Sequence, residues 1–61
     1  MTDQARIAKL KLATQHLREA QRLVTEALGK TDSAQTVHDD IEYVIEDLDV
    51  DIVYFQNGEP T

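Results

Sequence analysis

Hydrophobic residues recur every three or four positions through the first half of the chain, a spacing typical of one face of an α-helix. The stretch 3–28 lacks Gly and Pro and is rich in strong helix formers such as Ala, Leu, Gln and Lys. Thr2 stands where a helix N-cap is expected, and Gly29 follows the last periodic residue as a stop. The pattern therefore predicts a helix over about 3–28.

The same spacing returns in the second half and predicts a second helix over about 33–54. Asp32, with Gln35 three positions later, has the form of a capping box, which predicts that Asp32 caps this helix. Residues 29–32 form the turn, and a turn this short makes the two helices antiparallel neighbours in one helical hairpin domain. Residues 56–61 are expected to form a tail.

The end of the second helix allows an alternative. Polar and apolar residues alternate strictly from Asp47 to Ile52, and the Val, Ile, Tyr and Phe residues within 50–55 favour strands. An ααβ chain would then pair residues 48–55 with a strand of a second copy, because a lone strand is not stable. The unbroken helical phase of the apolar positions favours the all-α hairpin.

The apolar face of the first helix is too wide for one partner helix to cover. Leu and Val occupy one of the two seam positions of the heptad and Ala occupies the other, so large and small layers alternate. A chain of 61 residues without cysteine has no disulfide and is marginal as a monomer. We therefore expect a homodimer that forms an antiparallel four-helix bundle. Its core is expected to contain Leu10, Ala13, Leu17, Ala20, Val24, Val37, Ile41, Val44, Leu48 and Ile52.

Charge is segregated between the two halves. All six Lys and Arg residues lie within residues 1–30 beside three acids, whereas residues 31–61 carry nine acids and no base, and the net charge is −6. Such an acidic helix repels membranes and phosphates, so a basic protein surface is the expected partner. No apolar run approaches the roughly 18 residues that span a bilayer. The first residues also lack a signal-peptide pattern, so we expect a cytoplasmic location.

A second stripe lies on the second helix, away from its core face. Tyr43, Val50 and Tyr54 share this stripe and are bordered by carboxylates, a composition typical of a protein-binding hot spot. The candidate protein-binding residues are Tyr43, Glu46, Asp47, Val50 and Tyr54. The alternative is that the stripe closes a second interface within the dimer.

The first helix offers a competing site. Lys11, Arg18 and Arg22 share its outer face and could contact nucleic-acid phosphates. The helix has no aromatic residue for base stacking, and two Glu residues dilute the positive charge, so a solvated face is the favoured interpretation.

Residues for catalysis or metal binding are sparse. His16 and His38 lie on different helices, Cys is absent, and Ser33 in the turn is the single serine. The sequence contains no phosphate-binding loop and no nucleophile motif. We therefore expect neither an enzyme nor a metal or cofactor site.

The layout of the chain resembles the Rop family of plasmid copy-number regulators. The shared features are the length, the opening Met1-Thr2-x-Gln4, the alternating Leu and Ala seam, the mid-chain turn and the close from Phe55 to Gly58-Glu59. This resemblance implies a hairpin that dimerises into a four-helix bundle. It also implies RNA binding by the first helix through a central aromatic residue, amides and a lysine. Thr14 and Leu17 occupy that stretch here.

The small size and acidic charge are also similar to those of accessory proteins from the early regions of lambdoid phages. Together these features predict a non-enzymatic regulatory adaptor of phage or mobile-element type. It would bind a host or phage protein through the acidic face of the second helix, with nucleic-acid mimicry as one variant. The alternative is a Rop-like RNA- or DNA-binding regulator that uses the basic face of the first helix.

Overall fold

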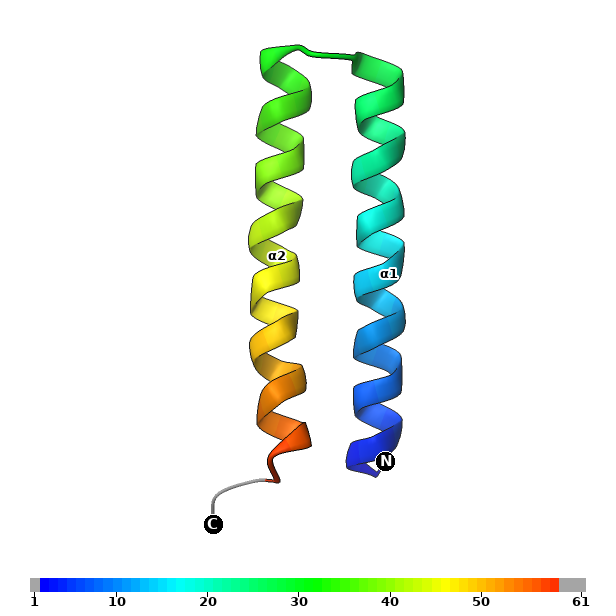
Figure 1. Ribbon diagram of the computed structural model, residues 1–61, viewed down its shortest axis with the longest axis vertical. Helices are drawn as coiled ribbons and strands as arrows, with labels where there is room; N and C mark the ends of the chain where they lie inside the picture. Colours follow the sequence, from blue (N-terminus) through cyan, green and yellow to red (C-terminus); the bar gives the residue numbers. More distant parts are fainter. Residues whose placement is uncertain (1, 59–61) are drawn as a thin grey trace.

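Two antiparallel α-helices make up the computed structural model, which describes residues 2–58 (Figure 1). Helix α1 spans Asp3–Leu28 and helix α2 spans Asp32–Gln56, and residues 2–58 contain no strand. The short connection lies at one end of a rod of 45 × 17 × 12 Å, and the start of α1 and the end of α2 lie at the other. The predicted helical hairpin is confirmed.

The limits of α1 are the predicted ones, and both are set by local hydrogen bonds. The Thr2 hydroxyl accepts the Ala5 N–H at 3.1 Å and so satisfies one of the free donors of the first turn. Gly29 adopts φ 67° and ψ −148°, a region in which a side chain would be strained. Its N–H donates to the Thr25 carbonyl at 2.9 Å, which closes the last turn.

The predicted cap of α2 is wrong. Thr31 caps the helix, because its extended backbone directs the hydroxyl to accept the Ala34 N–H at 3.1 Å. Asp32 is instead the first helical residue, where its negative charge favours the positive end of the helix dipole. The Gln35 side chain donates to Asp39 at 2.8 Å rather than reaching back to the cap.

The alternative strand over 48–55 is also wrong, because α2 continues without a break to Gln56. Apolar residues at helical spacing keep this segment against α1, and that burial outweighs the local preference of Val and Tyr for strands. The expected tail begins later than predicted, with Asn57 and Gly58 directly after the helix. Residues 59–61 of the expected tail lie outside the described residues.

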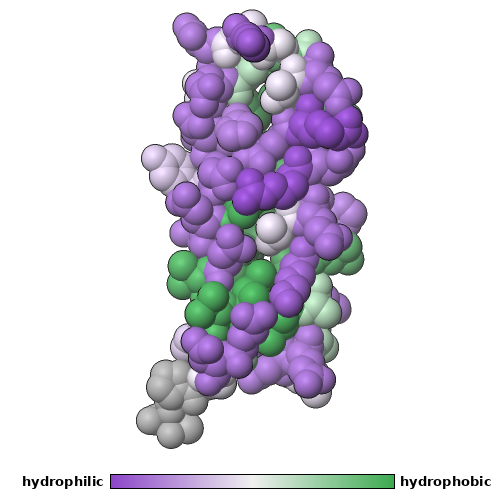
Figure 2. Space-filling model, viewed as in Figure 1, coloured by the Kyte–Doolittle hydropathy of each residue, from purple (hydrophilic) through white to green (hydrophobic). Residues whose placement is uncertain are grey.

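Burial in the hairpin is confined to a narrow line between the helices. Among residues 2–58 the buried apolar residues are Ala34, Ile45 and Ile52, and Ile45 has no exposed surface. Most of the predicted core is half-buried in the single hairpin: Leu10, Ala13, Leu17, Ala20, Val24, Val37, Ile41 and Leu48. Val44 is 47% exposed in the single hairpin, and its place in the core of the dimer stays a prediction. Figure 2 shows hydrophobic residues gathered mainly in the half nearest the chain ends on the face in view.

The cap assignment can be tested by replacing Thr31 with Ala. We expect the free energy of unfolding to fall by about 1 kcal/mol, the usual contribution of such a cap. Urea denaturation should be measured at fixed protein concentration and high salt, which screens the charge of Asp32. Ser33→Ala, in the exposed first turn, is the control and should have little effect. A larger loss for Asp32→Ala than for Thr31→Ala would contradict the assignment.

Candidate functional site

The stripe on α2 faces directly away from α1. Tyr43 and Val50 each precede a buried isoleucine, Ile45 or Ile52, by two positions, and Tyr54 follows Ile52 by two. Two positions correspond to a turn of about 160° around the helix axis, so these side chains point outward. In the hairpin their exposed fractions are 67% for Tyr43, 68% for Val50 and 42% for Tyr54. The structure thus places the predicted apolar stripe on one open surface.

Carboxylates border this stripe, and most have no basic neighbour. Glu46 and Asp47, the two predicted acidic members, are exposed. Asp39, Glu42, Tyr43 and Glu46 together line a shallow hollow of about 290 Å³ on α2. Glu42 is bound to Arg18, whereas Glu46 and Asp47 form no ion pair with any of residues 2–58. The outer face of α2 therefore combines apolar area with free negative charge.

The stripe is anchored at the end nearest the termini by an aromatic contact. The rings of Tyr54 and Phe55 meet edge to face, with centroids 5.3 Å apart. The Arg6 guanidinium lies 5.5 Å from the centre of the Phe55 ring, within the range of a cation–π interaction. Because Phe55 is half-buried against α1, the Tyr54 ring is held by a neighbour that is itself fixed.

The basic residues of α1 are mostly occupied by acidic partners. Arg18 donates to Glu42 of α2 at 2.9 Å, an exposed ion pair of about 0–1 kcal/mol. Arg22 is bound by Glu19 and Glu26 on its own helix. Lys11 forms no ion pair within residues 2–58. The three candidate phosphate ligands therefore do not present a common free positive surface.

A buried amide in the helix contact was missed by the sequence analysis. Gln21 is 5% exposed, donates to the His38 carbonyl of α2 at 3.1 Å and accepts from Arg18 at 3.3 Å. The signal that could have found it is its heptad position: Gln21 follows Ile7 and Thr14 at intervals of seven and so lies on the line that faces α2. A polar residue on such a line favours one register of the two helices.

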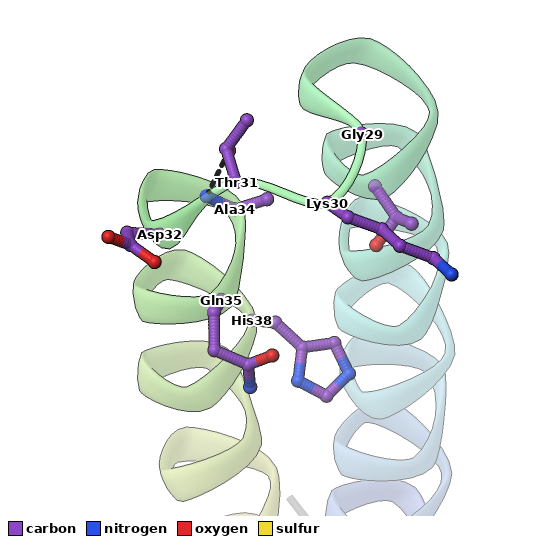
Figure 3. Close-up of a pocket in the computed structure, with 8 residues that line it drawn as sticks. Gly29, Lys30, Thr31, Asp32, Ala34, Gln35 and His38 are labelled. Atoms are coloured by element: carbon purple, nitrogen blue, oxygen red, sulfur yellow. Dashed lines mark hydrogen bonds between the residues drawn. The ribbon is translucent and has the colours of Figure 1, made fainter.

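The connection between the helices borders a hollow of about 480 Å³, and His38 projects into the space between α1 and α2 beside it (Figure 3). Its Nδ1 atom is buried and lacks a hydrogen-bond partner among the described residues. The nearest carboxylate oxygen, on Asp39, is 3.6 Å away, which is too long for a hydrogen bond. Within residues 2–58, no three His, Asp or Glu side chains are grouped so that they could hold a metal ion.

No protein-family model matches the chain, and neither the curated proteins nor the solved structures contain a significant match. Neither α1 nor α2, the helices of the described part, is both long and apolar enough to cross a membrane.

The ion pairs around Arg22 predict a pH effect at Glu19. The hydrogen bonds that Arg22 donates lower the pKa of the Glu19 carboxyl below its ordinary value. The stabilisation from this contact is present above that ordinary value and is lost as the pH falls through the lowered pKa. An NMR titration should show a low midpoint for Glu19 that returns to the ordinary range in Arg22→Gln. Lys11→Gln, the control, should leave the midpoint unchanged.

This titration also tests the basic face of α1. If Arg22 bound nucleic-acid phosphates instead of Glu19, added RNA would raise the pKa of Glu19 toward its ordinary value. We expect no such change, since two carboxylates already occupy the guanidinium.

Proposed function

We propose that the protein is a small non-enzymatic regulatory adaptor that binds a protein with a basic surface through the outer face of α2. The observation that carries this proposal is the exposed stripe of Tyr43 and Val50 beside unpaired carboxylates. Tyrosine contributes contact area and a polar tip at an interface, and the carboxylates steer a positively charged partner. Size, charge and architecture favour a phage or mobile-element origin.

The active form is proposed to be a homodimer that forms a four-helix bundle. The hairpin exposes 4657 Å², whereas a compact protein of 6.9 kDa exposes about 4,000 Å². The excess is close to the roughly 800 Å² that each partner buries in a standard interface. The half-buried Leu and Ile residues along the seam supply the apolar surface that a second copy would cover.

Direct nucleic-acid binding through Lys11, Arg18 and Arg22 is the alternative, and the ion pairs of the two arginines disfavour it. A bound phosphate would have to displace Glu42, Glu19 and Glu26. The nine acids of residues 31–61 would repel the same polyanion.

A comparison of three immobilised forms tests the adaptor function in a lysate of the source cells. We expect wild type to retain a protein that Tyr43→Ala/Val50→Ala loses by at least about tenfold, as for hot-spot residues. Leu12→Ala/Leu23→Ala is the matched control, because both leucines are 52% exposed on α1. Circular dichroism should show that both double variants keep their helices.

Two outcomes would contradict the adaptor proposal. One is a partner that survives Tyr43→Ala/Val50→Ala but is lost in the α1 control. The other is RNA or DNA binding that weakens steeply with salt and disappears in Arg18→Glu/Arg22→Glu, which would support the alternative.

The dimer is tested by Ala20→Glu, which places a charge among the apolar residues of α1. We expect sedimentation to show wild type at twice 6.9 kDa and the variant to dissociate and lose helix content together. Ala8→Glu, at an exposed alanine of the same helix, should remain dimeric. A folded wild-type monomer at micromolar concentration would refute the dimer.

A further inference from the structure

We infer that the second copy of the proposed dimer packs with its loop at the same end of the bundle, so that each α1 lies beside the partner's α2. This inference rests on the dimer proposed above and specifies which surfaces meet. It follows from the apolar face that the hairpin leaves uncovered and from the charges along the two edges of that face.

The uncovered face is located by the Arg18–Glu42 ion pair, which bridges the helices on one broad side of the hairpin. Ala20 follows Arg18 by two positions and Val44 follows Glu42 by two, so both lie about 160° around their helices from the bridge. Ala13 and Val37, five positions before the bridge residues, point the same way. We call the side that these four residues share the open face. Leu17, Ile41 and Leu48 are half-buried between its edges.

The two edges of the open face carry opposite charge. The α1 edge carries Lys9, which lies one helical turn before Ala13. The α2 edge carries Asp40, Asp47 and Asp51, all exposed. Neither Lys9 nor any of these three aspartates forms an ion pair with residues 2–58.

Two symmetric dimers can bury the open face, and they differ in these edges. With loops at opposite ends, the α1 helices of the two copies pack against each other, and so do the two α2 helices. Residues 31–61 carry no base, so the acids of one α2 then face the acids of the other at every register. With loops at the same end, each acidic edge faces the α1 edge that carries Lys9. One exposed ion pair contributes little to stability. The charges on the two edges attract each other in one orientation and repel each other in the other, and this difference selects the orientation.

The register of the hairpin identifies the charges that meet. Arg18 contacts Glu42, Gln21 contacts His38 and Arg6 contacts Phe55. The two residue numbers of each contact add up to about 60, so Lys9 lies level with Asp51. When the loops lie at the same end, both copies have the same residues at each height along the bundle axis, so Lys9 lies beside the partner's Asp51.

This orientation has consequences for the proposed binding face. The two α2 helices become diagonal, so the stripes of Tyr43 and Val50 face outward on opposite sides of the bundle. The dimer would therefore offer two separate acidic sites. The two α1 helices are not neighbours either, and no continuous basic surface of paired α1 helices forms.

Spin labels at the turn measure the orientation directly. The chain has no cysteine, so Ser33→Cys gives one label per copy in the first turn of α2, next to the loop. We expect an inter-label distance on the order of 20 Å, because neighbouring helices lie about 10 Å apart. Loops at opposite ends would separate the labels by nearly the 45 Å length of the hairpin and would overturn the inference. Gln15→Cys, at mid-helix, is the control because both orientations give it a similar distance.

The same samples separate failure of the orientation from failure of the dimer. Sedimentation that shows only monomer would refute both the dimer and the orientation. A dimeric mass with a long Ser33→Cys distance would refute the orientation alone.

Reversing one charge at the edge of the open face tests the orientation independently, because the two orientations predict opposite changes in dimer affinity. With loops at the same end, Asp51→Lys should weaken the dimer by up to about thirtyfold, because the symmetric dimer contains two such exposed pairs, and Lys9→Glu should restore it. With loops at opposite ends, Asp51→Lys would relieve repulsion between the α2 helices and tighten the dimer. Glu46→Lys makes the same charge change away from the open face and corrects for net charge. Tightening by Asp51→Lys beyond this control, or no restoration, would overturn the inference.

Discussion

The contact between α1 and α2 is about one side chain wide, and this narrow contact determines how much apolar surface the rest of the molecule leaves exposed. Ile45 is enclosed completely and Ile52 almost so, but residues one position to either side of this line already meet solvent. Two helices alone cannot surround a wider core, however apolar their sequences are. The chain therefore carries more apolar surface than its own fold can bury, and much of that surface lies on defined faces.

The narrow line also explains why a polar residue is tolerated within it. Gln21 replaces an apolar side chain at the centre of the contact, where its amide donates to the His38 carbonyl. An apolar residue would pack equally well in several registers, whereas this hydrogen bond is formed in one. The nearby Arg18–Glu42 pair repeats the same register on the surface. Stability comes from the isoleucines, and alignment comes from these polar contacts.

Sequence periodicity predicted the helices well because their signals are local. Thr2 and Gly29 set the limits of α1 through contacts within four residues. The cap of α2 was misassigned because Thr31 and Asp32 are both good capping residues, and the choice depends on the backbone angles of the turn. The strand alternative failed because alternation over six residues is weaker than an apolar phase kept over the whole helix.

The candidate site was predictable in composition but not in its ionic contacts. The outward direction of Tyr43 and Val50 follows from helical geometry once the buried face is known. The Arg18–Glu42 pair joins residues 24 positions apart, so it depends on how the two helices are rotated about their axes. Periodicity gives the direction of each face but not this mutual rotation. Val44, which is predicted for the core of the dimer, lies on the open face and is 47% exposed in the hairpin.

The positions of the exposed apolar residues argue for two kinds of partner rather than one. A second copy on the open face can cover Val44 and complete the burial of Leu17 and Ile41. It cannot reach the outer face of α2, because Tyr43 and Val50 point away from α1 and lie more than a quarter-turn from the open face. An apolar surface that neither α1 nor a second copy covers lowers the solubility of the dimer. Its free carboxylates offset that cost while the stripe is unoccupied, and they favour a basic protein when one binds.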